Sequence, residues 1–329
     1  MRRRRFLRGC LALAATPALA HDGESRVERH ALAFGTRVAI TIAGLPRAQA
    51  ERAADAAMAR IARVERAVDL HDPASPLARL NRDGVVEAPA DGDLAALMRH
   101  ALAWSARSEG AFDVTIQPLW QRHFSAWAQG RAASRAELRP LMAAVGWQGI
   151  AIEGDHIRLA APRMQCTLNG LAQGYASDAA WAVLAAHGVR HALVDAGEPF
   201  AAGFARPGQP WRIGVRDPRP RAADAADWLD VLAINDAALA TSGNDGFAFT
   251  RDRRLFHILD PRTGVSPGEL QSATVLAADA CTADALSTAC MVLGRRRALD
   301  AVAEAGAQAL LVLHDGRVVA TRGWPGRRG

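Results

Sequence analysis

The sequence predicts a single α+β domain whose sheet is mixed and mostly antiparallel. The 329 residues suffice for one large domain or two ordinary ones, and no internal repeat or low-complexity linker divides them. Half of the residues are hydrophobic, which is typical of a globular rather than a disordered chain. Short runs in which apolar and polar residues alternate are interspersed with longer runs of helical spacing, so strands and helices are expected together.

The helices are predicted from apolar residues that recur every three or four positions. In chain order they cover residues 49–70, 93–108, 134–145, the part of 168–188 that follows its two glycines, and 282–305. Ser134 and Glu137 are spaced as a capping box, which marks the start of the third helix.

The strands are predicted from alternation and from the turn residues that bound it. In chain order they cover residues 37–44, 150–160, 191–197, 211–218, 231–243, 254–261, 272–278 and 309–323. The second and the last are expected to be hairpins, with turns at residues 153–155 and at Asp315 and Gly316. Residues 71–84 are expected to be a loop with a short helical turn, and residues 219–227 a surface loop.

The first twenty residues have the composition of a cleaved export signal. They carry five arginines and no acidic residue, then an apolar run from Leu11 and an Ala-x-Ala cleavage site that ends at Ala20. The order of residues 3–8 resembles a twin-arginine signal, with an ordinary secretory signal as the alternative. We therefore expect cleavage after Ala20, a periplasmic location, and one functional domain over residues 21–329.

The charge of the chain argues against a nucleic-acid partner. The whole sequence carries a net charge of +6, and removal of the five leader arginines leaves +1. A nearly neutral protein is poorly suited to a polyanion. No later segment approaches about 18 consecutive apolar residues, so no transmembrane segment is expected in the mature chain.

Three cysteines follow the leader, Cys166, Cys281 and Cys290. An odd number leaves at least one unpaired in an oxidising compartment, and the absence of a C-x-x-C pair argues against a zinc site. We expect these side chains to be buried as small hydrophobic residues.

The stretch "TADALSTA" contains the first candidate site. Asp284 and Thr288 are four residues apart, so on a helix they project from the same face, among small and apolar neighbours. A carboxylate and a hydroxyl are hard oxygen ligands that suit Mg²⁺. The alternative is a helix capped at Thr282, with Asp284 as a favourable acidic residue in its first turn.

Three further segments carry candidate residues. His257 lies on the predicted strand 254–261, before a turn of the sequence Asp-Pro-Arg-Thr-Gly, and is either structural or catalytic. Thr241 and Ser242 place two hydroxyls before a glycine turn. Asp113 lies among bulky apolar residues and therefore needs hydrogen-bond donors or a ligand.

In this order the segments resemble the ApbE-like FAD:protein FMN transferases. The resemblance begins at "AFGT" and "DPASPLARLN" and continues through "GAFDVTIQPL", "LNGLAQGYASD", "VDAGEPFAAG", "WRIGVRDP", "ATSG", "FHILDPRTG" and "TADALSTA". It spans nearly all of the chain beyond the leader. Each motif alone is weak, but the ordered series is specific.

The resemblance implies a fold, an activity and a set of partners. The fold is a T-fold-related α/β domain, and the activity is Mg²⁺-dependent transfer of FMN from FAD to a Thr or Ser hydroxyl through a phosphoester, with release of AMP. The implied partners are FAD and an exported or membrane-bound acceptor flavoprotein. Mg²⁺ and helix N–H groups would balance the phosphate charge at "LNGLAQGY", because the chain contains no lysine.

The resemblance also implies the roles of particular residues. The metal positions match Gly170 (through its carbonyl), Asp284 and Thr288. The flavin-nucleotide positions match Phe34, His71, Ala111, Phe112, Asp113, Thr167 and Gln173, and the pyrophosphate positions match His257 and Ile258. His257 is the candidate general base, because the pKa of an unperturbed histidine is near neutral pH.

Two positions depart from the common family pattern. Many relatives have Asp where this chain has Thr167, and Lys or Glu where it has Gln173. These departures favour one alternative, a flavin-binding or flavin-delivery accessory protein of a respiratory complex. Two further alternatives stand beside it: an FAD pyrophosphatase in which water replaces the acceptor hydroxyl, and a purely structural secreted domain.

Overall fold

The computed structural model describes residues 26–219 and 228–326. The predicted export signal and nearly all of the predicted loop 219–227 lie outside the described residues. Within them the chain folds as the predicted α+β domain, and the strand pairings are antiparallel.

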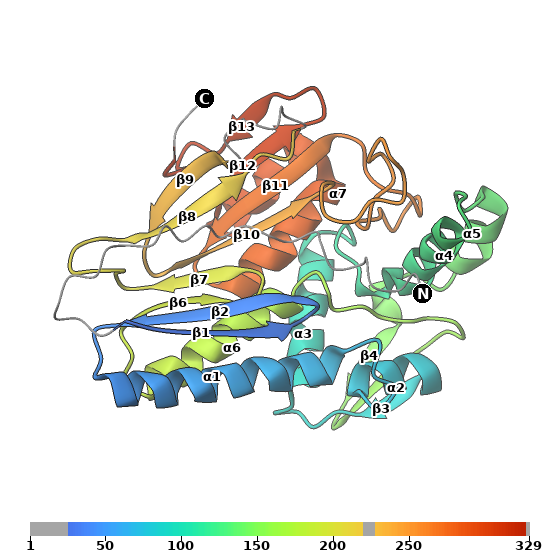
Figure 1. Ribbon diagram of the computed structural model, residues 1–329. Helices are drawn as coiled ribbons and strands as arrows, with labels where there is room; N and C mark the ends of the chain where they lie inside the picture. Colours follow the sequence, from blue (N-terminus) through green and yellow to red (C-terminus); the bar gives the residue numbers. More distant parts are fainter. Residues whose placement is uncertain (1–25, 220–227, 327–329) are drawn as a thin grey trace.

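The central sheet has eight strands in the order β1-β2-β6-β7-β10-β11-β12-β13. Their bounds are β1 (Val27–Ala33), β2 (Thr36–Ala43), β6 (His191–Asp195), β7 (Pro199–Ala202), β10 (Ala237–Gly243), β11 (Leu270–Ala277), β12 (Gln308–Leu313) and β13 (Val318–Ala320). β2 pairs with β6, and β7 pairs with β10. These two pairings join distant parts of the chain in one sheet (Figure 1).

Helices α1 (Arg47–Val68), α3 (Asp93–Arg107), α6 (Ala172–Ala186) and α7 (Ala280–Glu304) contribute to the main core. α1 packs on α6, α6 packs on α7, and α7 packs on β10 and β11 (Figure 1). The buried face of α1 is mostly alanine at helical spacing, which allows a close approach to its neighbours. α7 bends at Gly294, whose φ of 72° is not helical.

A second, smaller core lies on the other face of the sheet. There β8 (Trp211–Arg216) and β9 (Trp228–Ile234) form a two-stranded sheet that packs on strands of the central one. Along β10, Ala238 and Ala240 belong to the main core and Leu239 to the smaller one. This alternation follows from the period of two of a strand.

The remaining elements surround this framework. β3 (Val85–Glu87), β4 (Ile150–Glu153) and β5 (His156–Leu159) form a three-stranded sheet beside α2 (Pro76–Asp83). α4 (Gln117–Ala128) follows the short helix η1 (Val114–Ile116), and α5 (Arg135–Met142) packs on α4. The predicted capping box of α5 is confirmed, with both hydrogen bonds formed.

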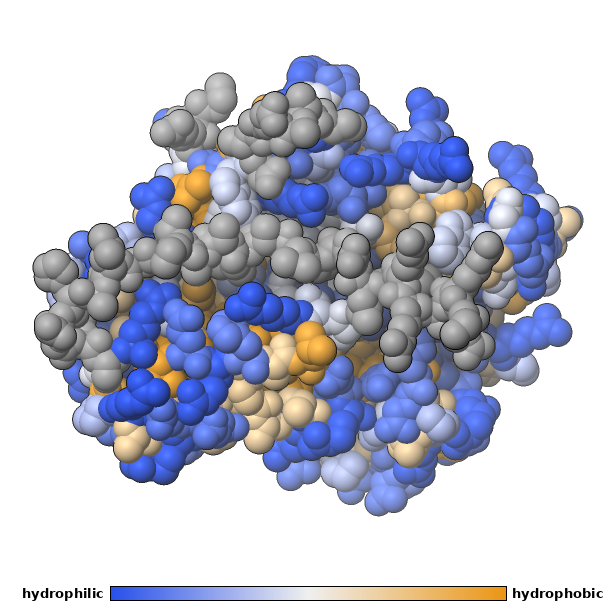
Figure 2. Space-filling model, in the orientation of Figure 1, coloured by the Kyte–Doolittle hydropathy of each residue, from blue (hydrophilic) through white to orange (hydrophobic). Residues whose placement is uncertain are grey.

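The predicted burial of the cysteines is confirmed, since Cys166, Cys281 and Cys290 are all buried with free thiols. Burial raises the pKa of the Cys290 thiol to about 12. Among the described residues, no helix combines the length and apolar character that a membrane span requires. The face shown in Figure 2 is largely hydrophilic, with smaller apolar areas near its centre and edges.

The predicted strand 231–243 is wrong as a single strand. β9 ends at Ile234 and β10 begins at Ala237, and the two strands belong to different sheets. The chain turns between them at Asp236, whose φ is 50°. Aspartate tolerates this left-handed conformation better than most residues do, so the turn fits its sequence.

The predicted strand 254–261 is also wrong. Only an isolated bridge between Ala248 and Phe256 is found in this region. The Ser266 hydroxyl accepts from Phe256 N at 2.7 Å and donates to Phe256 O at 2.8 Å. A side chain therefore bonds the backbone groups that a neighbouring strand would need.

Helices α6 and α7 approach each other most closely at Gly174. A Cβ atom added to Gly174 would lie 2.2 Å from Ala280 O and 2.9 Å from Asp284 Cβ. Both distances are shorter than van der Waals contact, so the two helices can pack in this way only with glycine at this position.

We expect Gly174→Ala to lower the free energy of unfolding by about 1–3 kcal/mol, because the added methyl group must push α7 away from α6. Urea unfolding measures this difference. Gly268→Ala is the control, since a Cβ atom there meets nothing within 4 Å and Gly268 has no left-handed φ. Equal stability of the two variants would contradict the close approach at Gly174.

Candidate functional site

Carboxylates from two helices hold the N-terminal end of α7. Asp279 caps the helix and accepts from Thr282 N at 2.7 Å. Asp178 of α6 accepts from Ala280 N and Cys281 N, both at 2.8 Å. These are N–H groups that the first turn of a helix leaves without partners. The predicted alternative, in which Thr282 caps the helix and Asp284 lies in its first turn, is therefore wrong.

Asp284 lies one turn further along α7 and faces α6. Its side chain is buried, and Oδ2 accepts from Gly174 N at 3.0 Å. Burial, with the nearby charge of Asp178 as a smaller cause, raises the pKa of Asp284 to about 7. The fold therefore maintains a costly carboxylate at this point, which favours a functional explanation over helix capping.

A chain of hydroxyl groups continues from Asp284 towards β10. Ser242 Oγ lies 3.1 Å from Thr288 Oγ1 and 2.8 Å from Ser287 Oγ. Gly170, the third predicted metal position, lies beside Thr288, because a Cβ atom added to Gly170 would be 3.4 Å from Thr288 Oγ1. The structure thus brings the three predicted metal positions and the predicted hydroxyl of Ser242 into one region.

The turn between β6 and β7 adds two carboxylates to this region. Burial raises the pKa of Asp195 to about 6, and burial together with Asp284 and Asp195 raises the pKa of Glu198 well above its usual range. Gln173 reaches the same turn, because a Cβ atom added to Gly197 would lie 2.1 Å from Gln173 Nε2. The predicted nucleotide residue Gln173 is therefore adjacent to acidic groups.

Asp113 has a complete set of internal partners. Oδ1 accepts from Thr115 N at 2.8 Å and from Thr115 Oγ1 at 2.6 Å, and Oδ2 accepts from Trp147 N at 3.0 Å. Burial still raises the pKa of Asp113. Of the two possibilities that the sequence left open, hydrogen-bond donors or a ligand, the fold itself supplies the donors.

This carboxylate shapes the loop that carries the other predicted flavin positions. Ala111 and Phe112 are buried, and a Cβ atom added to Gly170 would lie 3.0 Å from the Phe112 ring. Thr167 N donates to Val114 O at 2.8 Å, which fixes the segment before Gly170 to the same loop. These positions therefore adjoin the predicted metal residues.

His257 is held by the chain that follows β10. Its backbone N–H donates to Phe247 O at 2.9 Å, and its Nδ1 atom lies 3.2 Å from the same oxygen. The tautomer that satisfies this contact carries the proton on Nδ1 and leaves Nε2 as an acceptor. Burial lowers the pKa of His257, and Asp245 opposes this only partly. The next residue, Ile258, is buried in the main core.

Two further predicted flavin positions, Phe34 and His71, lie on segments of the chain outside the loop that Asp113 shapes. Phe34 lies in the β1–β2 turn with a φ of 51°, and its N–H donates to Glu65 Oε1 at 2.6 Å. His71 follows α1, is exposed, and donates its N–H to Asp69 Oδ1 at 2.7 Å.

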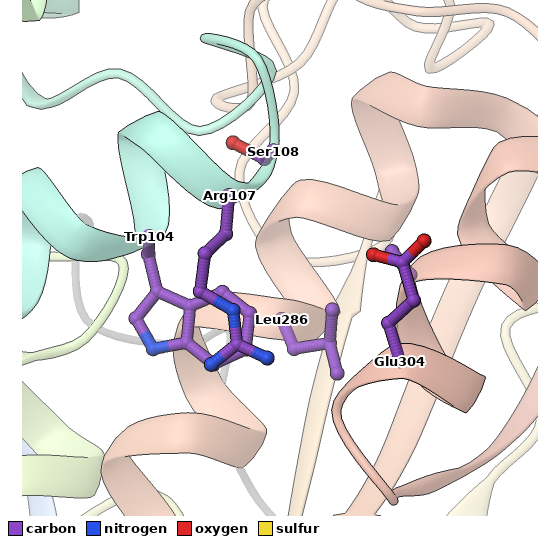
Figure 3. A pocket seen from close by; sticks show the side chains of 6 residues that line it. Trp104, Arg107, Ser108, Leu286 and Glu304 are labelled. Atoms are coloured by element: carbon purple, nitrogen blue, oxygen red, sulfur yellow. The ribbon is translucent and has the colours of Figure 1, made fainter.

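Two concave regions of the described chain lie away from these residues. One is a cavity of about 10 Å³ between α3 and α7, where the Arg107 guanidinium lies over the Trp104 ring (Figure 3). It has room for about one water molecule. The other is a groove of about 260 Å³ lined in part by Arg63, Arg66 and Pro89. No predicted site residue lines either region, so neither is a candidate for the flavin site.

The donor set fits a hard divalent cation. It offers carboxylate, hydroxyl and carbonyl oxygens, and no thiol or imidazole adjoins Asp284 in the contacts described above. In the described chain, no three His, Cys, Asp or Glu side chains are grouped closely enough to hold a metal by themselves. Mg²⁺ commonly takes only one or two carboxylates and completes its shell with phosphate and water, so this arrangement suits it.

Sequence reasoning missed three carboxylates in this region, Asp178, Asp195 and Glu198. The sequence did contain a signal for Asp195 and Glu198, because these two acidic residues lie within four positions, on either side of a glycine, at the end of a strand. Asp178 gave no comparable signal, because its partners are separated from it by about a hundred residues in the chain.

Comparisons with known proteins point to one family. The ApbE family model matches residues 34–311. An FAD:protein FMN transferase of Treponema pallidum is 30% identical over 92% of this chain and 89% of its own. One of Vibrio cholerae is 32% identical over 66% of this chain, and the match spans 65% of that relative.

Solved structures show the same fold. The ApbE protein of Thermotoga maritima is 28% identical with a TM-score of 0.81, over 91% of this chain and 97% of its own. The flavin transferase ApbE of Vibrio cholerae is 25% identical with a TM-score of 0.77, over 91% of this chain and 98% of its own.

The raised pKa of Asp284 predicts how stability without metal depends on pH. The folded state binds this proton more tightly than an unfolded carboxyl does, so the stabilisation is present at low pH and is lost between about pH 4 and pH 7. We expect the melting temperature in EDTA to fall less for Asp284→Asn than for the wild type between about pH 5 and pH 8.

Both proteins share the other shifted groups, but the charge of Asp284 also raises the pKa of Glu198, so the comparison reports Asp284 together with its effect on Glu198. Asp178 and Asp195 act in the same direction as Asp284, whereas His257 and His123, with lowered pKa values, act in the opposite one. Parallel melting curves for the two proteins across this pH range would show that the Asp284 carboxyl titrates normally.

Proposed function

The chain belongs to the ApbE family and is a flavin transferase, and from this premise we propose the details of its reaction. It transfers FMN from FAD to a Thr or Ser hydroxyl of an acceptor protein, in the presence of Mg²⁺, and releases AMP. The observation that carries the proposal is the convergence of Gly170, Asp284 and Thr288 beside the partly buried carboxylates of the β6–β7 turn. No arginine of the described residues forms an ion pair with these carboxylates, and a divalent cation with a bound pyrophosphate would supply positive charge.

The residues that would hold Mg²⁺ are the Asp284 carboxylate, the Thr288 hydroxyl and the Gly170 carbonyl. When bound there, the cation would offset the charge that builds on the departing phosphate. Gly174 N–H orients the Asp284 carboxylate, and the contact of Ser242 with Thr288 orients that hydroxyl. These neighbours fix the ligands in place without contacting the cation themselves.

The flavin nucleotide would lie along the loop that Asp113 shapes. Ala111, Phe112 and Thr167 border Gly170 from that side, and Gln173 approaches from the start of α6. Thr167 Oγ1 accepts from Asn169 N at 3.3 Å, so its hydroxyl also supports the turn before Gly170. Phe34, His71 and Ile258 complete the set of flavin-nucleotide positions in this proposal.

His257 is the proposed general base. The acceptor hydroxyl would transfer its proton to Nε2, the atom that the contact of Nδ1 with Phe247 leaves free. A bond then forms between the acceptor oxygen and the phosphorus of FMN. The bond between that phosphorus and the bridging oxygen breaks, and AMP leaves with the oxygen.

The proposal extends to location and partners. Residues 1–20 direct export, cleavage follows Ala20, and the acceptor is an exported or membrane-bound flavoprotein. The basic and apolar order of the leader supports this, and N-terminal sequencing of the mature protein tests the cleavage site.

We expect Asp284→Asn to lower the rate of FMN transfer by about a hundredfold or more, because a neutral amide binds Mg²⁺ weakly. Thr288→Val should raise the Mg²⁺ concentration needed for half-maximal rate and lower the rate less. The measurement is transfer rate against Mg²⁺, with covalent FMN on the acceptor detected by mass spectrometry.

The control for this pair is Asp279→Asn, which removes a charge from the same helix while an amide can still cap it. Its transfer rate should stay close to that of the wild type. A fully active, Mg²⁺-responsive Asp284→Asn protein would place the cation elsewhere. Release of free FMN without labelled acceptor would indicate the pyrophosphatase alternative, and saturable FAD binding without either product would indicate the accessory protein.

The role of His257 predicts a dependence of the rate on pH. Its pKa is lowered from the ordinary value of 6.5, so the base is neutral and competent above that pH. We expect the single-turnover rate to fall only at pH values below 6.5, where His257 becomes protonated, and His257→Gln to be slow at every pH without this decline. A His257→Gln enzyme that keeps the same acidic decline would assign the base to another group.

A further inference from the structure

We propose that Glu198 supplies a second carboxylate to the cation site and so increases its affinity for a divalent ion. The inference rests on the proposed function, which places the cation at Asp284, Thr288 and Gly170. None of the motifs that predicted the site assigned a role to Glu198, although it lies in the stretch "VDAGEPFAAG".

The turn between β6 and β7 is built to hold Glu198 at one place. Ser177 Oγ of α6 accepts from Ala196 N at 3.1 Å and donates to Glu198 O at 2.5 Å. Between these two residues Gly197 has a φ of 116°, a conformation that a residue with a Cβ atom rarely adopts. The backbone of Glu198 is therefore fixed to the first turns of α6.

The same turns of α6 also face α7. Ser177 follows Gly174 by three residues, and Gly174 N–H donates to Asp284. One short segment of helix therefore positions Asp284 through its backbone and Glu198 through a side chain. The backbone of Glu198 and the carboxylate of Asp284 are thus held by residues only three positions apart on α6.

The carboxylate of Glu198 reaches β10 beside the hydroxyl groups of the site. Its Oε2 atom accepts from Thr241 N at 3.2 Å. The next residue, Ser242, contacts the predicted metal residue Thr288. No described residue donates to the Oε1 atom of Glu198. One oxygen thus anchors the side chain, and the other remains as an acceptor.

The negative charges in this region are not balanced by positively charged side chains of the described protein. Asp195, Glu198 and Asp284 form no ion pair there, and Arg37 is near enough only to lower the pKa of Asp195 slightly. Asp93, by contrast, is a largely buried carboxylate that Arg60, Arg63 and Tyr175 all contact. Buried carboxylates without a counter-charge are costly, and a divalent cation offsets that cost.

A purely structural role makes the opposite prediction for stability. If Glu198 served only to pin the turn to β10, its replacement would destabilise the protein and leave cation binding unchanged. If Glu198 belongs to the cation site, Glu198→Gln removes repulsion from Asp284 and Asp195. The metal-free protein should then be at least as stable as the wild type, and the cation should bind less tightly.

The test is Mn²⁺ binding to the mature protein without FAD, measured by electron paramagnetic resonance or calorimetry at about pH 8. We expect Glu198→Gln to raise the Kd for Mn²⁺ by about 10–100-fold and Glu198→Asp to restore part of the affinity. Melting temperatures in EDTA, measured alongside, should not fall for Glu198→Gln. Glu269→Gln is the matched control, because Glu269 accepts a backbone N–H of α7 at an exposed position beyond the bend and should leave the Kd unchanged.

The outcomes separate this inference from the proposed function. Wild-type protein that binds no Mn²⁺ would overturn both. If Asp284→Asn loses tight Mn²⁺ binding but the Kd of Glu198→Gln stays within twofold of the wild-type value, only the role of Glu198 is overturned. Should Glu198→Gln fail to fold, Glu198→Asp decides, because a structural turn would tolerate it with an unchanged Kd whereas a displaced ligand weakens binding.

Discussion

The contact of Gly174 with α7 is the constraint on which the site depends. Because residue 174 has no side chain, Ala280 O and the Asp284 side chain can pack against the backbone of α6. That approach allows the Gly174 N–H to reach Asp284 and allows Asp178, one turn later, to reach the first N–H groups of α7. The same two turns of α6 also hold the β6–β7 turn through Ser177. Gly174 thus sets the distance between α6 and α7. The positions of the Asp284 carboxylate, the N-terminal end of α7 and the β6–β7 turn depend on that distance.

The electrostatic character of the site follows from this packing. Carboxylates from α6, α7 and the β6–β7 turn are brought together in a region of low solvent access, and burial is the largest cause of every raised pKa among them. At other positions the protein pairs an acid with arginine, as at Asp93 and at Glu137, where two arginines hold the pKa of the carboxyl well below its usual range. The contrast shows that the chain has the means to neutralise a carboxylate and does not use them at Asp284.

Local patterns predicted the long elements well. The spacing of apolar residues located α1, α3, α6 and α7 to within a few residues, and the capping box of α5 formed as its sequence indicates. Prediction failed where tertiary contacts decide. Residues 254–261 alternate like a strand, but the Ser266 hydroxyl bonds the backbone of Phe256, and only an isolated bridge to Ala248 forms there. The pair Asp284 and Thr288 could be found from their spacing alone, whereas Asp178 and Glu198 acquire their significance only when α6 meets α7.

The absence of lysine makes the source of positive charge the central question for a site that would bind a pyrophosphate. Helix N–H groups were one expected source, yet those of Ala280, Cys281 and Thr282 are bonded to Asp178 and Asp279, and that of Gly174 is bonded to Asp284. The N-terminal end of α7 is therefore engaged with the protein's own acids. An anionic substrate that approached alone would meet several carboxylates and no facing arginine among the contacts described, so repulsion would oppose it. The same carboxylates attract a divalent cation, and the cation in turn attracts the pyrophosphate. The acids that make this region unsuitable for a free phosphate are thus the feature that would make it selective for a phosphate bound together with a metal ion.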